Sequence, residues 1–360
     1  MTMYLMDRGI PSDRTPTLTG TRMVQVTQYE EHPFAQYVRI LGKGKNGSRA
    51  MSEDEAFTAM RMILNDEVEP VQLGAFLMLM RVKEETPEEV AGFVRATRDW
   101  IRLPADAPAV DLDWSSYAGK RRQLPWFLLS TLLLAGYGKR VFMHGASGHT
   151  NGRIYTKDVL AALGIAPCTS IEDACRRLED DNFAYLDIQY LCPKLHTIIE
   201  LRPLLGLRSP VHTVARSINP FGAPYVMQGI FHPGYRPMHQ EAAQLLGEAN
   251  VAVIKGEGGE IERNPDIDCL VQYVRHGELD EIEWPALFAR RHVKDESLDV
   301  QRLAALWRGE SQDEYGAAAV VSTAAIALHL MGEANDPAGA LALAQRMWDE
   351  RARDKYVRAA

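Results

Sequence analysis

The sequence predicts an α/β fold, in which a small helical bundle domain precedes a larger α/β domain with a mostly parallel sheet. Three observations predict it. Helical periodicity with capping signals occupies residues 33–104, and short apolar runs alternate with helical stretches from about residue 108. Hydrophobic residues make up 46% of the 360 residues, which is enough for a sizeable core. In such sheets, ligands bind beyond the carboxyl ends of the strands.

The helical domain is predicted from its helix starts. Ser52 followed by Glu55 is a capping box that precedes an amphipathic stretch. A second apolar helix follows Pro70, and a third begins at Thr86, with Glu89 as its capping-box partner. The connections are short, so these helices should form a compact bundle.

The remaining boundaries follow from where the periodicity changes. Residues 1–32 show no clear period and are expected to form a poorly ordered extension. The helical domain covers 33–104 and is expected to be completed by part of 190–215. The α/β domain covers 108–350.

The α/β domain is predicted from apolar runs that alternate with helical patterns. The predicted strands are 110–112, 140–146, 225–231 and 251–256, and the predicted helices are 125–136, 157–165 and 239–250. This alternation predicts parallel strands with helices on both faces. The loops SSYAGKRRQLP and HGASGHTNGR, which follow the first two strands, should therefore lie at the same edge of the sheet.

Composition excludes several classes of protein. The net charge of -8 argues against a protein that is basic all over. The longest apolar run, 126–136, is too short to span a bilayer, which takes about 20 residues, so no membrane association is expected. No two cysteines have CxxC spacing, which indicates neither a zinc site nor a disulfide framework but reduced thiols in a cytoplasmic protein. The cysteines are Cys168, Cys175, Cys192 and Cys269.

Charge is unevenly distributed along the chain. Residues 114–157 contain no acid, and 189–240 contain only Glu200. The cations in these two segments and in the glycine-containing segment LGKGKNGSR are Lys43, Lys45, Arg49, Lys120, Arg121, Arg122, Lys139, Arg140, Arg153, Lys157, Lys194, Arg202, Arg208, Arg216 and Arg236. Phosphates are the natural partners of such loops. The alternative is structural: Lys139 and Arg140 end a helix, and Arg208 pairs with a buried carboxylate.

Aromatic residues lie among these cations, and nucleic-acid bases can stack on exposed rings. Tyr117 and Tyr235 are the better surface candidates, because Trp126, Tyr225 and Phe231 lie in apolar runs and are expected in the core.

Segment 196–222, HTIIELRPLLGLRSPVHTVARSINPFG, contains an R-x-x-L-G-x-R … N-P pattern. It resembles the nucleoside phosphorylase and anthranilate phosphoribosyltransferase superfamily, of the glycosyltransferase family 3 type, and VLAALGI at 159–165 resembles the helix after that family's second strand. The resemblance covers about 33–350 and implies the same two-domain fold. The matching positions of the pattern are Arg202, Gly206, Arg208, Asn219 and Pro220.

Three family motifs are altered in this sequence. The family binds the pyrophosphate of phosphoribosyl pyrophosphate with a G-T-G-G-D loop after the first strand, where this chain reads SYAGKRR and keeps only Gly119. The second-strand K-H-G-N motif appears as MHGA, 143–146. The magnesium-binding Asp-Glu pair aligns with Gly259 and Glu260, which leaves one carboxylate fewer for a hard cation. These changes imply that the ancestral chemistry is lost or much changed.

The altered pattern itself resembles the YbiB-type branch of this superfamily. That resemblance implies a homodimer joined through the helical domains, which binds DNA or RNA with little sequence preference along a basic groove. Nucleic-acid binding of this kind needs no cofactor and no catalytic residue. The residues predicted to contact phosphate are Lys43, Lys45, Arg49, Tyr117, Gly119, Lys120, Arg121, Arg122, His144, His149, Arg153, Lys157 and Arg202. Among them, His149 and Arg153 are expected to be more exposed, while His144 is either a phosphate contact or a structural hydrogen-bond partner.

Two other functions remain open. In the first, the chain is a phosphoribosyltransferase or nucleoside phosphorylase of divergent specificity. Arg202 would then contact a carboxylate acceptor, Lys120 would reach a phosphate, and Glu260 would hold Mg²⁺; otherwise Glu260 lies in a structural turn. In the second, the chain is a scaffold that binds protein partners through its helical face.

Overall fold

The structure is a computed structural model that describes residues 30–295 and 297–357. The predicted extension at 1–32 therefore lies almost entirely outside the described residues. Within these ranges, none of the helices is long and apolar enough to cross a membrane.

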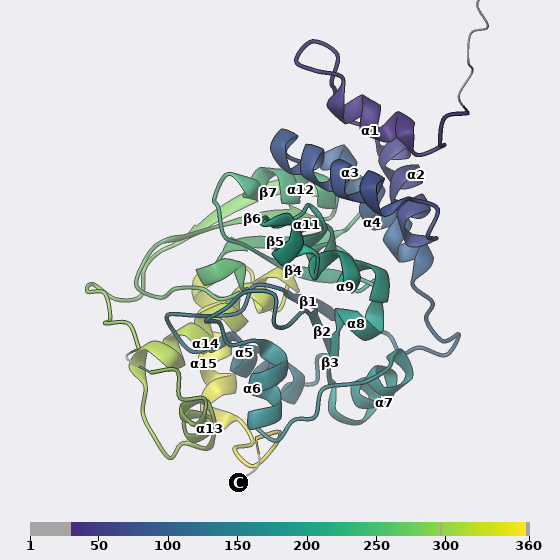
Figure 1. Ribbon diagram of the computed structural model, residues 1–360. Helices are drawn as coiled ribbons and strands as arrows, with labels where there is room; N and C mark the ends of the chain where they lie inside the picture. The colour runs from purple at the N-terminus through teal and green to yellow at the C-terminus, as the bar shows by residue number, and fades with distance from the viewer. Residues whose placement is uncertain (1–29, 296, 358–360) are drawn as a thin grey trace, which may run out of the picture. The chain divides into compact units, whose positions relative to one another are not determined.

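The helical part consists of short helices that pack together (Figure 1). Both predicted capping boxes, at Ser52 and Thr86, are present. Helices α2 and α4 pack closely, and a Cβ at Gly92 would lie 2.8 Å from Ala56 Cβ, so only glycine permits this approach. The helices are α1 (Ala35–Gly42), α2 (Glu53–Leu64), α3 (Pro70–Lys83) and α4 (Pro87–Trp100).

The sheet is mostly parallel, which confirms the predicted fold class. Its seven strands run in the order β3-β2-β1-β4-β5-β6-β7. The first five are parallel, and β6 and β7 add an antiparallel hairpin at one edge. Strands β3, β6 and β7 are not among the strands that the sequence predicts. The strands are β1 (Leu112–Ser116), β2 (Val141–Gly145), β3 (Phe183–Asp187), β4 (Tyr225–Ile230), β5 (Asn250–Lys255), β6 (Cys269–Arg275) and β7 (Glu278–Trp284).

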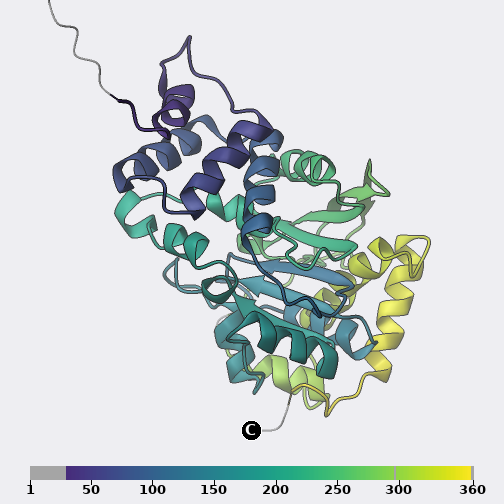
Figure 2. The same cartoon turned by 90° about the vertical axis from the view of Figure 1, so that its right-hand side faces the viewer.

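Helices cover both faces of the sheet. Trp114 and Met143 belong to the core that contains α5, α14 and α15, whereas Phe142, one position earlier than Met143, belongs to the core shared with α4, α8 and α11. Figure 2 shows the C-terminal helices, in yellow, beside the sheet. The helices of this part are α5 (Phe127–Gly136), α6 (Thr156–Ala162), α7 (Ile171–Asp181), α8 (Ile188–Leu191), α9 (Pro193–Ile199), α10 (Arg202–Leu205), α11 (Val211–Arg216), α12 (Tyr235–Leu245), η1 (Glu257–Gly259), α13 (Gln301–Arg308), α14 (Glu314–Leu330) and α15 (Pro337–Glu350).

The fold brings two predicted loops together. Backbone hydrogen bonds join Lys120 and Ile154 in both directions, each 2.9 Å long. The loops after β1 and β2 therefore lie side by side beyond the carboxyl ends of parallel strands, where ligands bind in such sheets.

Candidate functional site

Lys120, which is predicted to contact phosphate, does not lie on the surface. Its side chain is 1% exposed, and Nζ lies 2.5 Å from Glu262 Oε1 and 3.3 Å from Glu257 Oε2. Burial alone would lower the pKa of Lys120, but these two carboxylates raise it above its ordinary value. Lys120 is thus a buried ion-pair partner in this structure, while Arg121 and Arg122 are exposed.

The backbone after β1 forms an anion cradle, and Glu260 fills it. The N–H groups of Ala118 and Gly119 donate to Glu260 Oε1 over 2.6 and 2.5 Å. Ser116 Oγ donates to Oε2 over 2.8 Å and lies 2.7 Å from Thr156 Oγ1. Glu260 is fully buried. Successive N–H groups that converge in this way form an anion-binding concavity.

The acids of this segment do not suit a magnesium ion. Both oxygens of Glu260 already accept hydrogen bonds, and Glu257 and Glu262 are bound to Lys120. Gly259 supplies no second carboxylate beside Glu260. Within the described residues, no group of three or more His, Cys, Asp or Glu could hold a metal. Because Mg²⁺ needs free oxygen ligands, the residues present do not fit it.

Four arginines converge beside this cradle: Arg153, Arg202, Arg208 and Arg216. We call them the arginine cluster. Arg202 and Arg208 both donate to Thr150 Oγ1, and Arg153 Nη1 donates to Ala118 O over 2.7 Å. Arg216 Nη1 donates to His212 O over 2.6 Å.

The arginine cluster has no counter-ion within hydrogen-bond reach in the described part of the chain. Among the ion pairs of the described residues, none joins any of the four to a carboxylate, so the alternative that Arg208 pairs with a buried acid is wrong. Burial and the charges of Arg216, Arg153 and Arg202 lower the pKa of Arg208 to about 10. Burial also lowers the pKa of Arg216, which Glu260 partly offsets. An anionic ligand would relieve this repulsion.

His149 is buried at the centre of this repulsion. It is 8% exposed, so the expectation that it is an exposed residue is wrong. Nε2 donates to Tyr117 O over 2.8 Å, and Nδ1 lies 3.0 Å from Thr150 Oγ1. Burial and the charge of Arg208 lower the pKa of His149 to about 4, so the ring is neutral at pH 7.

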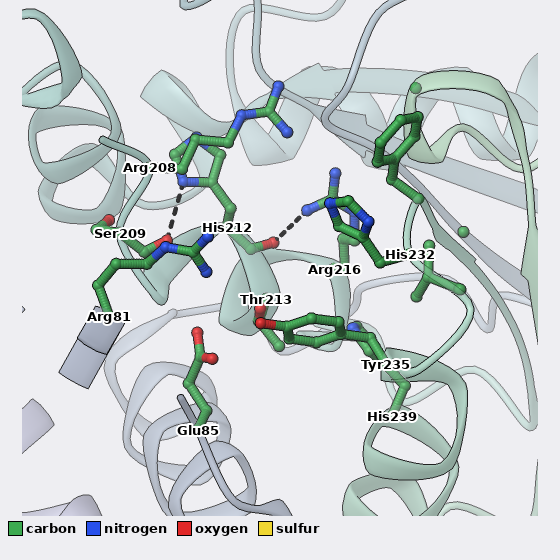
Figure 3. Close-up of a pocket in the computed structure, with 14 residues that line it drawn as sticks. Arg81, Glu85, Arg208, Ser209, His212, Thr213, Arg216, His232, Tyr235 and His239 are labelled. Carbon is green, nitrogen blue, oxygen red and sulfur yellow. Dashed lines mark hydrogen bonds between the residues drawn. The ribbon is translucent and has the colours of Figure 1, made fainter. Parts of the chain in front are cut away.

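A cavity of about 150 Å³ opens beside the arginine cluster (Figure 3). In Figure 3, Arg81, Arg208 and Arg216 surround His212, and Tyr235 lies across from them. Glu85 is the one carboxyl in the lining, and burial raises its pKa. The cavity is therefore cationic, and one of the cations that line it, Arg81, belongs to helix α3.

Phe231 stands between this cavity and a second one. It is 51% exposed, contrary to the expectation that it lies in the core, and it lines both cavities together with His232. The second cavity, of about 450 Å³, is lined by Arg122 and Lys255 and also by Lys120 with its partners Glu257 and Glu262. An exposed aromatic ring is thus shared by two cavities that both carry cations.

The other predicted residues lie elsewhere or inside the fold. Tyr117, expected at the surface, is fully buried and bonds His144 Nδ1 over 2.7 Å, while His144 Nε2 lies 3.2 Å from Asp113 Oδ1. His144 is thus a structural hydrogen-bond partner in this structure. Lys157 is half-buried in the first turn of α6.

The cations at 43–49 are exposed and belong to the α1–α2 connection. Arg49 is held by Glu55 through two hydrogen bonds of 2.6 Å. Lys43, Lys45 and Arg49 line neither cavity. Whether any of the predicted residues binds phosphate stays a prediction.

Sequence reasoning missed Arg81, Arg208, Arg216, Phe231 and Lys255 as site residues. Arg216 was visible only as one of several cations in an acid-poor segment, and Phe231 as the last residue of an apolar run. No sequence signal distinguishes Arg81 from any other cation at the end of an apolar helix.

Comparison with known proteins identifies the fold. Residues 36–100 match the glycosyl transferase family, helical bundle domain, and residues 127–350 match the glycosyl transferase family, a/b domain. The anthranilate phosphoribosyltransferase of Thermus thermophilus superposes with a TM-score of 0.73 at 24% identity, over 87% of this chain and 94% of that chain.

Sequence relatives include proteins of two kinds. The anthranilate phosphoribosyltransferase of Desulfitobacterium hafniense (strain DSM 10664 / DCB-2) is 34% identical over 212 residues, which cover 58% of this chain and only 62% of that relative. The uncharacterized protein YbiB of Escherichia coli (strain K12) is 28% identical over 237 residues, which cover 64% of this chain and 73% of YbiB. Together with the two domain matches, these findings show that the chain belongs to the glycosyl transferase family and has the anthranilate phosphoribosyltransferase-like fold.

Proposed function

We propose that the protein binds nucleic acid, with little sequence preference, along the two cavities that meet at Phe231. The observation that carries the proposal is the arginine cluster, in which four guanidinium groups converge and none has a carboxylate partner among residues 30–295 and 297–357. Unpaired, partly buried cations are costly, and a ligand that brings phosphates would offset that cost. The resemblance to the YbiB-type branch supports the same function.

The arrangement suits a phosphate chain better than a single small anion. Arg208 and Arg216 line one of the two cavities that share Phe231, and Arg122 and Lys255 line the other. A base can stack on the exposed ring while phosphates on either side meet the cations. Guanidinium and ammonium groups recognise phosphate, which is the same at every nucleotide, so little sequence preference is expected.

The proposal is tested with a fluorescent oligonucleotide. Arg208→Gln and Phe231→Ala should each weaken binding about tenfold, which corresponds to about 1.4 kcal/mol, equally for unrelated sequences. Arg208→Gln should also reduce the slope of log affinity against log salt by about 1. Arg346→Gln, which removes an exposed cation from α15, is the matched control and should change neither.

Three results would overturn the proposal. The wild-type protein could fail to bind any oligonucleotide at low salt. Arg208→Gln could bind with unchanged affinity and salt slope. Arg346→Gln could weaken binding as much as Arg208→Gln, which would indicate a diffuse charge effect.

A second candidate function is phosphoribosyl transfer with changed specificity. It is favoured by the family itself and by the relative in Desulfitobacterium hafniense that bears the name anthranilate phosphoribosyltransferase. In this candidate, Arg202 would contact the carboxylate of an acceptor, and Arg208 would be structural. The filled cradle and the absence of a fitting magnesium site among the described residues speak against it. Turnover of phosphoribosyl pyrophosphate with anthranilate and Mg²⁺ would establish it.

The expected homodimer also stays a proposal. Helix α3 exposes Val71 and Val82, whose side chains are apolar and 79% and 82% accessible. Sedimentation of the wild-type chain would test it.

A further inference from the structure

The cradle after β1 has the geometry of an anion site, yet its ligand is part of the chain. Two successive N–H groups, of Ala118 and Gly119, and the Ser116 hydroxyl all donate to one carboxylate. Gly119 has φ +68°, which turns its N–H toward the same point as that of Ala118. The donors and their geometry suit a phosphate oxygen as well as a carboxylate oxygen.

Glycines bring Glu260 to this position. After β5 the chain doubles back through Gly256, Gly258 and Gly259, the last two with φ of +70° and +100°. A Cβ on Gly258 would lie 2.7 Å from Gly119 O, and one on Gly256 would collide with Glu260 O. The segment that carries the carboxylate is therefore shaped to press against the cradle loop.

No cation pairs directly with Glu260 in the described part of the chain. Its charge is met by the three donors, and Arg216 feels it at longer range. Removing the carboxylate would leave two buried N–H groups, a hydroxyl and a nearby guanidinium without an anion. Such a set would take up an anion from solution, because an unmet buried donor costs about 1–3 kcal/mol.

We propose that Glu260 is a built-in anion that occupies the Ala118–Gly119 cradle and excludes phosphate and diphosphate groups from it. Glu260 therefore determines which ligands the protein accepts: the cradle is closed to a free diphosphate, and external phosphates are left to the neighbouring arginine cluster. This inference does not depend on nucleic-acid binding, because it concerns only competition at the cradle.

Calorimetric titration with inorganic pyrophosphate, without metal, tests the competition in the full chain. Wild-type protein should show no saturable binding that involves the cradle. Glu260→Ala should bind pyrophosphate at least tenfold more tightly than the wild type. Glu260→Gln is the matched control, since its amide oxygen fills the same space and accepts the same N–H groups, so the variant should resemble the wild type.

The amide signals of Ala118 and Gly119 locate the binding by NMR. In Glu260→Ala they should shift on addition of pyrophosphate, whereas in the wild type they should not. Shifts of these two signals in the wild type would overturn the proposal, whether or not any variant folds. A folded Glu260→Ala protein that binds no more tightly than the wild type would also overturn it. If Glu260→Ala does not fold, Glu260→Ser, which also removes the carboxylate, replaces it with the same expected shifts.

Discussion

Two neighbouring regions at the edge of the sheet treat charge in opposite ways. In the acidic segment 257–262, every carboxylate has partners within the chain: Glu257 and Glu262 hold Lys120, and Glu260 fills the cradle. In the arginine cluster, four cations converge and none has a carboxylate partner among the described residues. We call segment 257–262 the complete region, because each of its carboxylates has a partner. We call the arginine cluster the incomplete region, because its charges have no partner of opposite sign among the described residues.

The difference separates structural charge from charge available to ligands. A buried charge with a partner stabilises the fold only as part of its pair, and the pair has nothing left to offer a ligand. A group of like charges held close together raises the free energy of the folded protein until an anion binds. Burial and pairing, rather than residue type, therefore distinguish Lys120 from Arg208.

The largest expected effect comes from breaking the complete region. Glu262→Ala leaves the Lys120 ammonium in the interior with only Glu257 at 3.3 Å and removes the acceptor of the Phe127 N–H. We expect the free energy of unfolding to fall by about 3–5 kcal/mol, because an uncompensated buried charge is strongly destabilising. Urea denaturation at pH 7 measures this.

A double variant provides the control. Lys120→Met combined with Glu262→Gln removes both charges and should recover part of the loss, since a buried ion pair can be replaced by uncharged side chains of similar volume. A loss below about 1 kcal/mol in Glu262→Ala would place Lys120 in a solvated position and contradict the structure.

Local chemistry explains which parts of the fold the sequence predicts. The capping boxes at Ser52 and Thr86 join residues three positions apart, so the pattern is readable in the chain itself. Strand β3 was missed because its five residues directly follow a polar helix. Strand β7 is largely exposed and polar, so it lacks the apolar run by which buried strands are recognised.

The site was less predictable because its decisive contacts join distant residues. From the sequence alone, Lys120 would be assigned to the surface. Its partner Glu262 lies 142 positions later, so the sequence around Lys120 gives no sign of the pair. Glu260 meets Gly119 across 141 positions. Phe231 follows the last residue of β4, and its side chain is exposed although the preceding residues of the strand are buried. The composition of the sequence predicts which loops are poor in acids. Which of their cations can still bind a ligand depends on ion pairs that only the structure shows.

A smaller effect is expected from adding charge to the incomplete region by lowering the pH. His149 has a folded-state pKa of about 4, below the value of about 6.5 in the unfolded chain, because burial and Arg208 disfavour its charged form. Its contribution to stability is therefore complete above pH 6.5 and is lost as the pH falls toward 4. The expected loss is about 1.4 kcal/mol per pH unit in that window.

Comparison with His149→Gln isolates this contribution, since glutamine does not titrate. Urea denaturation between pH 6.5 and 5 should show the wild-type free energy of unfolding falling more steeply than that of the variant. His239, whose pKa is also lowered by burial, titrates in both proteins and cancels in the difference. The charge of His149 also lowers the pKa of His212, so the difference reports these two histidines together. Parallel curves would mean that His149 is not held neutral by the cluster.

The smallest effect, and the one opposite in sign, comes from removing a charge from the incomplete region. Arg208→Met keeps the apolar stem of the side chain and deletes a guanidinium whose pKa is lowered by burial and by three neighbouring arginines. The hydrogen bond it gives up, to Thr150 Oγ1, is 3.2 Å long. We expect the free energy of unfolding to rise by about 0.5–1 kcal/mol at low salt, because repulsion is relieved at the cost of one weak hydrogen bond.

Added sulfate turns this gain into a test of the whole comparison. Sulfate should stabilise the wild type more than Arg208→Met, since an anion that binds only the folded state adds stability in proportion to its affinity, and the gain of the variant should shrink or reverse. Arg346→Met, from the exposed face of α15, should show neither the gain nor the sulfate effect. If Arg208→Met were destabilising at every sulfate concentration, the guanidinium would be a structural element already satisfied within the fold, and the contrast between the two regions would fail.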